Sequence, residues 1–445
     1  MTVTPFNSAL FAGSLNDPQV SQLFSDAAQI RAMLRVEAAL ARAQGAIGVI
    51  PEEAADIIER TCAAWTPEPE DFAGGTARDG IVVPALVAGL RQAVGEPYAS
   101  HVHFGATSQD IIDTAFVLCL RSALDVIGPR LDDLCATLAN LADAHRPTLC
   151  LSRTRAMQAV PTVFGLKVAN WLAPVVRARD ELEAVRKASL VLSLGGAAGT
   201  MSALGHQAIE TAEAMTKVLK LEAASTPWHT QRDRMAAIAG WMARLCGSLG
   251  KMGADMVILA QSEVGEISFE GAGGSSTMPN KANPVAAEIL VSMGRYAALL
   301  AGAMHEAQIA GNERDGSAWM LEWLALPQMA CAAGCASARA LDAVRTLRID
   351  QSRMRSNLDA SNGLVLAEAA TFALMEAGFD RAEASGFVKQ ACGRTANGEH
   401  MVDALHDLVE EADVDWDALR NPANAIGQAD ELIDRGLAEA GIEQD

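Results

Sequence analysis

Residues 273–284, GGSSTMPNKANP, bring two serines, a lysine and an asparagine into a glycine-rich segment directly ahead of an apolar helical run. Glycine and serine let such a segment change conformation, and Pro284 is typical of the first position of a helix. Lys281 is therefore expected beside the positive end of a helix dipole. A serine that closes over such a site could exchange a proton with a carbon acid, while the positive groups stabilise the charge that develops.

A phosphate-binding loop is the competing interpretation of this segment. It would require the pattern G-K-[ST] after a β-strand, and the sequence offers neither. Asn283 is predicted to cap the following helix, because its side chain can accept a hydrogen bond from a free backbone N–H group. The segment therefore indicates acid–base chemistry rather than nucleotide binding.

A second polar segment, HVHFGATSQDIIDTA at residues 101–115, also precedes a long helical run. Thr107 or Ser108 could simply cap that helix, with the acids of its first turn favourably placed at the dipole. The functional alternative is that these hydroxyls and the free N–H groups of the helix start bind a carboxylate. The sequence leaves both interpretations open, and His103 is a further candidate for contact with a ligand.

A third polar segment, SRTRAMQAVP at residues 152–161, places Arg153 and Arg155 on either side of Thr154. In an acidic chain, two arginines could merely be solvated. They could equally form a fork that binds a dicarboxylate through paired, charge-assisted hydrogen bonds. Both interpretations stay open at this point.

The composition limits the class of the protein. Half of the 445 residues are hydrophobic, with much alanine, and the formal net charge is −20. Nucleic acid would select a basic face, so nucleic-acid binding is disfavoured. The eight cysteines include no CxxC pair, which favours reduced core thiols over a zinc site. The chain lacks a signal-peptide pattern, and glycines break its longest uncharged stretch, so a soluble, cytoplasmic protein is expected.

Helical periodicity dominates the elements that must position these segments. A Pro/Gly-rich passage at residues 66–80 is predicted to be a loop, and a bend at Gly128–Pro129 would be compatible with the first long helix. The predicted long helices cover residues 109–145, 158–190, 231–266, 285–311 and 317–347. Alanine, glycine and serine recur on their apolar faces, as expected of helices packed in a bundle and against copies of themselves. The predicted fold class is all-α.

The three polar segments together resemble a known family. GSSTMPNKANP is similar to the signature loop of the fumarase/aspartase superfamily, and HFGATSQDIIDTA and SRTRAMQAVPTVFGLK resemble its two other active-site regions, in the same order. STPWHTQRDR and NERD also fall where this family contacts substrate. The resemblance covers essentially the whole chain.

This resemblance implies a nearly all-helical protomer of three domains, here at residues 1–105, 106–348 and 349–445. It also implies a homotetramer around a central bundle of long helices, with active sites that three subunits share. No metal or organic cofactor is expected, because the protein would supply the stabilising charge itself. A small tricarboxylate is the expected partner, and neither nucleic acid nor a membrane is.

The family's functional residues carry over onto matching positions of this sequence. Ser275 corresponds to the general base, and Lys281 and Asn283 correspond to contacts with the substrate and the intermediate. The remaining candidates share an expected role in binding substrate: His103, Thr107, Ser108, Arg153, Thr154, Arg155, Gln231 and Arg314.

Position 155 departs from the family pattern. Many members, including fumarases, typically have RTH here, and that histidine assists the leaving group; this chain has RTR. The upstream ARDGIVVP also lacks the second imidazole of adenylosuccinate lyases. An amine or hydroxide leaving group benefits from a general acid, whereas a carboxylate, with an ordinary pKa of about 4, does not. The change favours the branch of the family that closes a lactone by adding a carboxylate to a double bond.

In that branch Ser275 would act as the acid or base, and the carbon next to a second carboxylate would pass through an enediolate-like species. An adenylosuccinate-lyase-like C–N lyase is the alternative, although the missing imidazoles count against it. A non-catalytic, structural relative is the alternative from a different class, and the intact GSSTMPNKANP segment counts against that one.

Overall fold

The chain forms two compact units, each assembled from segments that are distant in sequence. The computed structural model describes residues 4–271, 273–274, 278 and 281–441. Unit 1 consists of Met1–Arg130, Ala178–Gly247 and Ser292–Ala338. Unit 2 consists of Leu131–Arg177, Ser248–Val291 and Arg339–Asp445. The division into three domains that the family resemblance implies stays a prediction.

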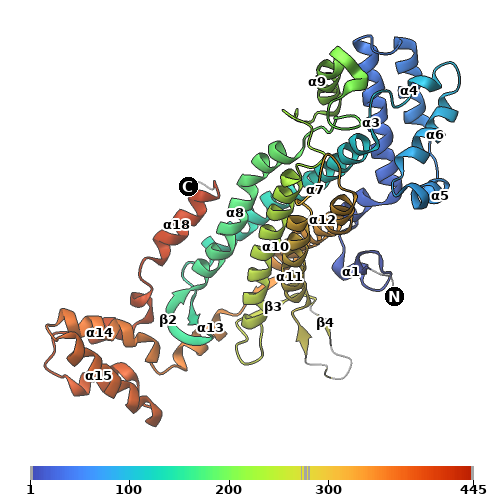
Figure 1. Cartoon of the computed structure of the whole chain (residues 1–445). Coiled ribbons are helices and arrows are strands. Elements are labelled where there is room, and N and C mark those ends of the chain that lie inside the picture. Colours follow the sequence, from blue (N-terminus) through green and yellow to red (C-terminus); the bar gives the residue numbers. More distant parts are fainter. Residues whose placement is uncertain (1–3, 272, 275–277, 279–280, 442–445) are drawn as a thin grey trace. The chain divides into compact units, whose positions relative to one another are not determined.

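Helices make up most of the described chain (Figure 1). The long ones are α3 (Asp26–Ala46), α7 (Ser108–Ala144), α8 (Phe164–Ser189), α10 (Asp233–Leu259), α11 (Val285–Glu306) and α12 (Gly316–Arg345). The shorter ones are α1 (Ala12–Leu15), α2 (Pro18–Ser21), α4 (Glu52–Ala64), α5 (Glu70–Asp79), α6 (Val83–Val94), α9 (Ala208–Leu219), α13 (Gln351–Asp359), α14 (Ala367–Glu376), α15 (Arg381–Arg394), α16 (Met401–Leu408), α17 (Trp416–Arg420) and α18 (Ala429–Glu439). The all-α fold class is confirmed.

Three small antiparallel sheets interrupt the helices in the described part of the chain. The pairs are β1 (Leu149–Thr154) with β2 (Met157–Val163), β3 (Ile267–Phe269) with β6 (Leu347–Ile349), and β4 (Gly273–Gly274) with β5 (Ala282–Asn283). The predicted helix at residues 158–190 is therefore wrong at its beginning, because residues 158–163 pair with β1 and α8 begins only at Phe164. Periodicity cannot separate a short apolar strand from a helix, and the β-branched residues here favour the strand.

The loop predicted at residues 66–80 is wrong in part, because most of it forms α5. Two acids in the first turn suit the positive helix end, and Gly80, with a φ of 72°, ends the helix in the left-handed conformation. A Cβ on Gly75 would lie 2.7 Å from Cβ of Ala85 in α6. The glycine that suggested a loop therefore allows two helices to pack closely.

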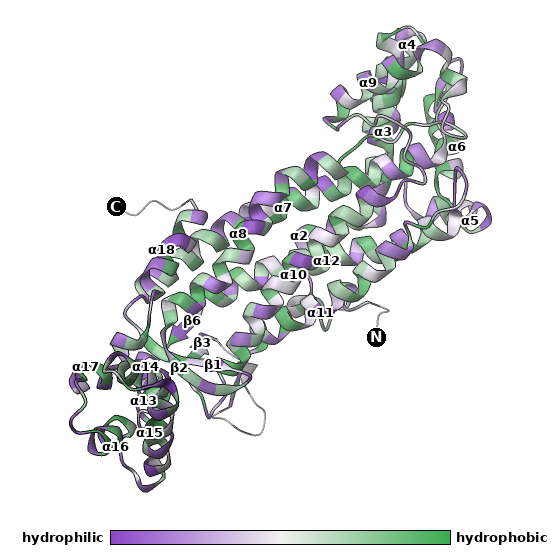
Figure 2. Cartoon of the chain, turned by 60° about the vertical axis from the view of Figure 1, so that its left-hand side comes forward, coloured by the Kyte–Doolittle hydropathy of each residue, from purple (hydrophilic) through white to green (hydrophobic). Residues whose placement is uncertain are grey.

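The other long helices occur where the periodicity places them, with shifted ends. α7 continues through Pro129 as one helix, while α10 ends at Leu259 and α11 ends at Glu306, both earlier than predicted. Hydrophobic and hydrophilic residues alternate in patches along α7 and α8 (Figure 2). That distribution is the pattern of helices with one buried and one solvated face.

Small residues set how closely neighbouring helices approach. In unit 1, a Cβ on Gly334 of α12 would lie 2.6 Å from Cγ2 of Val20. In unit 2, a Cβ on Gly253 of α10 would lie 2.6 Å from the carbonyl oxygen of Ala287 in α11. Packed interiors do not tolerate such contacts, so only glycine allows these approaches. The small residues expected at helix contacts are thus found there.

The C-terminal helices of unit 2 enclose an apolar core that also receives Leu151 of β1. Further members of this core include Leu358, Leu366, Leu374 and Leu405, all at most 2% exposed. Because Leu151 is anchored there, the strand that carries the polar hairpin residues has a fixed base.

All eight cysteines are free, and seven of them are buried. Burial, the largest cause, raises the pKa of Cys62 to about 12, so this thiol stays protonated. Among the described helices, α11 alone has the length and apolar composition that would let it cross a membrane.

Candidate active site

The start of α7 is built around the carboxylate of Asp110. This carboxylate accepts hydrogen bonds from the N–H groups of Thr107 at 2.9 Å and Gly195 at 2.7 Å. It also accepts from the N–H of Gly196 at 3.0 Å, and its Oδ1 lies 2.7 Å from Nε2 of His229. Four such partners offset the cost of burying a side chain in a residue that is only 1% exposed. Asp110 therefore fixes two distant segments, at Gly195–Gly196 and at His229, to one helix N-terminus.

A second buried network lies one turn further along α7. The Arg232 guanidinium donates to Asp113 at 2.8 Å and to Glu322 of α12 at 2.7 Å. The indole N–H of Trp319 donates to Asp113 at 2.9 Å. The guanidinium also lies over the ring of Trp228, 4.8 Å from its centroid. The segment 228–232 is thus anchored to both α7 and α12.

The charges of this network explain its pKa shifts. Burial alone would lower the pKa of Arg232, but the charge of Asp113 and the contacts with Glu322 outweigh it and raise that pKa. Burial raises the pKa of Glu322 above its ordinary value, and pairing with Arg232 offsets only part of that effect. Arg232 consequently stays charged and is fully engaged inside the protein.

These anchors bring two of the expected binding residues together. The exposed Arg314 donates from Nε to Gln109 at 3.0 Å, and from a terminal nitrogen to the hydroxyl of Thr107 at 3.1 Å. The same nitrogen donates to the carbonyl of Ala197 at 3.2 Å. Guanidinium, hydroxyl and helix N-terminus therefore meet at one place, which is a suitable arrangement for a carboxylate.

The choice between a cap and a binding residue can now be examined for Thr107. Its hydroxyl accepts the bond from Arg314, while its backbone N–H is bonded by the carboxylate of Asp110. Ser108 is the first residue of α7. Among the described contacts, the Thr107 hydroxyl thus accepts a hydrogen bond from a cation, and none from the N–H groups at the start of the helix. A role of Thr107 and Ser108 in substrate binding stays a prediction.

Gln231 lies in the segment that Arg232 anchors, and it is exposed. Its amide donates to the hydroxyl of Thr226 at 3.2 Å and to the carbonyl of Pro227 at 3.1 Å. Those two bonds orient the side chain without burying it, so it stays accessible to a ligand.

His103 faces a buried acid. Its Nδ1 lies 2.6 Å from Oε1 of Glu37 in α3, and the backbone at His103 is left-handed, with a φ of 64°. Burial alone would lower the pKa of His103, but the charge of Glu37 and the hydrogen bond to it outweigh this and raise the pKa. The imidazole therefore has a structural partner already, and its contact with substrate stays a prediction.

In unit 2, the two arginines of the β1–β2 hairpin have different surroundings. Arg153 makes a two-pronged ion pair with Glu266, with N–O distances of 2.6 and 3.1 Å. Asn357 adds a bond to the same carboxylate at 2.9 Å. The Glu266 side chain is fully buried and that of Arg153 is 17% exposed. The charge of Arg153 is therefore balanced within the protein.

Arg155 occupies the turn of the hairpin instead. Thr154 pairs with Met157, so that Arg155 and Ala156 alone form the turn, with φ of 50° and 68°. Thr154, Arg155 and Ala156 are all exposed. Two left-handed non-glycine residues in succession are strained, and such strain is concentrated at functional sites. Of the two arginines, Arg155 is the one available to a ligand.

The signature segment is described only in part. Ser275 lies outside the described residues, so its role as acid or base stays a prediction. Lys281 is exposed, and its backbone N–H donates to the carbonyl of Met278 at 3.0 Å. Asn283 pairs with Gly273 in the short sheet, two residues before α11 begins at Val285. Lys281 is thus four residues from the start of a long helix, as expected.

Comparison with known proteins agrees with this geometry. A model of the lyase family matches residues 14–298. The chain belongs to this lyase family. It is 38% identical over 445 residues to a 3-carboxy-cis,cis-muconate cycloisomerase of Bradyrhizobium diazoefficiens, covering 98% of this chain and 97% of that protein.

Two further relatives support the same assignment. A 3-carboxy-cis,cis-muconate cycloisomerase of Pseudomonas aeruginosa is 38% identical, with 99% of this chain and 98% of that protein covered. The crystal structure of 3-carboxy-cis,cis-muconate lactonizing enzyme from Pseudomonas putida superposes with a TM-score of 0.92 at 37% identity, covering 98% and 99% of the two chains. The resemblance to the fumarase/aspartase superfamily is confirmed, and these relatives match nearly the whole chain.

The sequence did not single out the residues that hold the site of this lyase together. Asp110 and Asp113 were expected only to favour a helix dipole, and His229, Arg232 and Glu322 were not assigned any role. The available signal was an unusual density of charge beside tryptophan in WHTQRDR, because buried charges require partners. Which acids those partners are depends on contacts between distant segments.

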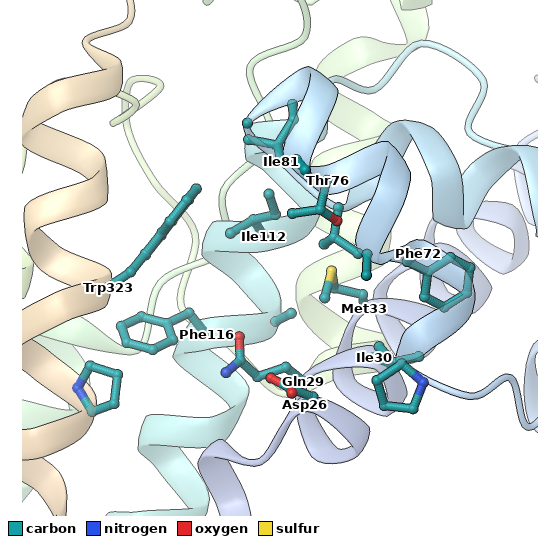
Figure 3. Close-up of a pocket in the computed structure, with 17 residues that line it drawn as sticks. Asp26, Gln29, Ile30, Met33, Phe72, Thr76, Ile81, Ile112, Phe116 and Trp323 are labelled. Carbon is teal, nitrogen blue, oxygen red and sulfur yellow. The ribbon is translucent and has the colours of Figure 1, made fainter. Parts of the chain in front are cut away.

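An apolar pocket of about 550 Å³ adjoins this region of the lyase in unit 1. Trp323 of α12 faces Ile112 and Phe116 of α7 across it, and Asp26 and Gln29 of α3 lie at one edge (Figure 3). Among the described residues that line it there is no cation. A substrate with several carboxylates is therefore not stabilised in this pocket.

No group of three or more histidine, cysteine, aspartate or glutamate side chains among the described residues could hold a metal ion. The expectation that the lyase needs no metal or organic cofactor stays a prediction.

Proposed function

We propose that this lyase is an intramolecular lyase, a cycloisomerase that interconverts 3-carboxy-cis,cis-muconate and 4-carboxymuconolactone. The observation that carries the proposal is Arg155. It stands exposed on the hairpin turn, at the position where the family resemblance places, in fumarases and adenylosuccinate lyases, a histidine that assists the leaving group. A guanidinium stays protonated and is a poor general acid, but it binds carboxylates well. The site thus suits a carboxylate that adds or leaves without proton transfer.

The proposed chemistry forms one bond and moves one proton. In the direction of ring closure, a carboxylate oxygen of the substrate bonds to one carbon of a double bond, giving a lactone. The other carbon, next to a second carboxylate, becomes enediolate-like and takes a proton from Ser275. Lys281 and the N-terminus of α11 stabilise the negative charge that develops. Ring opening reverses these steps, with Ser275 as the base.

Unit 1 supplies the proposed binding contacts for a further carboxylate. Arg314 and the Thr107 hydroxyl are 3.1 Å apart and converge at the start of α7. Ser108 and Gln231 complete this set at the same helix and the anchored segment beside it. A tricarboxylate needs several such cations in a chain of net charge −20, because the protein as a whole repels it.

We further propose a soluble, cytoplasmic homotetramer whose active sites combine regions from three subunits. Apolar surface on the long helices supports this assembly: Leu299 of α11 is 76% exposed and Leu324 of α12 is 66% exposed in the single chain. Copies packed along these helices would bury that surface.

An absorbance assay tests the proposed reaction. The full-length protein should change the ultraviolet absorbance of 3-carboxy-cis,cis-muconate and leave adenylosuccinate unchanged. Turnover of adenylosuccinate instead would establish the C–N lyase alternative. Turnover of neither, by a folded tetramer, would favour a non-catalytic relative.

Hybrid tetramers test the shared site. Ser275→Ala and Thr107→Ala should each be inactive alone, with a loss of about 10²-fold or more in kcat for the serine. Mixing the two variants should restore some activity, because the two residues come from different subunits at each site. Ser275→Ala mixed with Lys281→Ala is the control, since both changes lie in one segment and no intact site can form. Equal behaviour of the two mixtures would contradict a shared site.

A further inference from the structure

A cleft of about 520 Å³ lies between the β1–β2 hairpin, α8 and α10, entirely within unit 2. Its walls include Arg153 and Ala156 of the hairpin and Lys167 and Trp171 of α8. Lys251 belongs to the wall formed by α10. Three cations therefore face one cavity of a chain whose net charge is −20. None of the assigned substrate contacts except Arg153 lies in it.

The charges around this cleft are not all balanced. Arg153 is neutralised by its buried glutamate partner. Lys251 pairs with Asp255, one turn further along α10, and this carboxylate also accepts a bond from the indole N–H of Trp171 at 2.6 Å. Lys167 is half-buried and has no carboxylate partner among the described residues. The cleft consequently keeps one positive charge in excess.

We propose that this cleft binds a small carboxylate anion, with the ammonium group of Lys167 as its counter-charge. Such an anion would replace the missing partner of a half-buried lysine, and a partly desolvated ion pair is stronger than an exposed one. The side-chain amides of Asn170 and Gln261 also line the cleft and can donate hydrogen bonds. The proposal does not depend on the reaction proposed above.

The cleft adjoins the turn of the β1–β2 hairpin. Ala156 lines the cleft and is the direct neighbour of Arg155 on the strained turn. An anion held in the cleft would therefore lie beside the turn that carries Arg155.

Succinate is the probe, and titration calorimetry on the full-length protein is the measurement. The starting variant is Arg314→Ala, which removes a carboxylate contact of the proposed active site so that binding there does not mask the cleft. This variant should bind one succinate per chain. Adding Lys167→Met should weaken that binding by about ten- to a hundredfold, because one charge-assisted contact is lost.

Two further variants in the same background serve as controls. Lys217→Met removes an exposed lysine of α9 and should leave the affinity unchanged. Lys167→Arg keeps the charge and should retain binding to within about threefold, which separates a lost charge from a disturbed fold. Equal affinity with and without Lys167→Met, loss of binding in Lys167→Arg, or no succinate binding to Arg314→Ala would each overturn the proposal.

Discussion

The start of α7 and the β1–β2 hairpin both present an arginine to solvent, but they hold it in different ways. Arg314 donates to three partners around the helix N-terminus, and the segments beside it are fixed by buried acids. Arg155 stands on a two-residue turn with a left-handed backbone. One region has a cation fixed by its hydrogen bonds. In the other region, the backbone at Arg155 is constrained while its charged side chain is exposed.

This difference indicates separate tasks for the two regions. A fixed guanidinium beside a helix N-terminus is preorganised, so little is lost in ordering it when a carboxylate binds. An exposed guanidinium on a turn can follow a group that changes position during a reaction. The first region therefore suits recognition of a carboxylate that stays in place. In the reaction proposed above, the hairpin would suit the carboxylate that adds to or leaves the double bond.

The buried network at α7 should account for the largest effect. Arg232→Met leaves Asp113 and Glu322 as buried carboxylates without their cation, which should cost about 3–5 kcal/mol in the free energy of unfolding. Arg244→Met is the control, because its ion pair with Glu181 is exposed and worth less than about 1 kcal/mol. Urea unfolding followed by circular dichroism measures both. Similar losses in the two variants would remove the network from its anchoring role.

At the hairpin, Arg155→His restores the residue common among related lyases. It should raise KM for 3-carboxy-cis,cis-muconate and lower kcat/KM by about ten- to a hundredfold, because a charge-assisted contact of about 1.5–3 kcal/mol is lost. No C–N lyase activity should appear, since the second imidazole is still absent. Steady-state kinetics on both substrates measure this. A higher kcat on 3-carboxy-cis,cis-muconate would mean that a general acid had been missing and that the leaving-group argument fails.

The pair of His103 and Glu37 should make stability depend on pH. The folded state raises the pKa of His103 above 6.5, so the folded state holds the proton more tightly than the unfolded chain. The resulting stabilisation is complete below pH 6.5 and is lost as the pH rises through the higher folded value. His103→Gln should remove this dependence, and His206→Gln, at an exposed site, should keep it. Unfolding free energies between about pH 5 and 8, the range in which histidine titrates, measure this, and a His103→Gln profile identical to that of the wild type would mean that the pairing is wrong.

The strained turn should give the smallest effect. Ala156→Gly relieves about 1–2 kcal/mol of left-handed strain, but it adds about 0.4–1 kcal/mol of conformational entropy to the unfolded chain. A net gain of roughly 0.5 kcal/mol in the free energy of unfolding is expected from these opposing contributions. Ala136→Gly, at an exposed position inside α7, has no such strain to relieve and should be destabilising. Two destabilised variants would show that the turn is not strained.

Elements with long periodic patterns could be predicted from the sequence, whereas contacts between distant segments could not. Helical periodicity and small apolar residues predicted the long helices, and the capping pattern at Ser108 predicted where α7 begins. The hairpin was not foreseen, because β1 and β2 are too short for periodicity to separate them from a helix start. In the sequence, nothing distinguished Arg153 from Arg155 as a candidate for binding a ligand.

The distinction between Arg153 and Arg155 needed the fold. Glu266 pairs with Arg153 across 113 residues of sequence, and no local pattern marks it as the partner. In the same way, the imidazole that meets Asp110 is 119 residues away. Family motifs identified candidate positions for chemistry, whereas the supporting acids depend on which segments the fold brings together.

Each unit is assembled from discontinuous segments of the chain, and this affects when it can fold during synthesis. Unit 1 begins with the first residues and still requires Ser292–Ala338, while unit 2 requires the segment that runs to Asp445. Most of the chain must therefore be synthesised before either unit can complete its fold. Domains usually fold one after another during synthesis, starting from the N-terminus, and this arrangement does not permit that order. Apolar faces of early helices that pack against the late segments are therefore covered only late in translation.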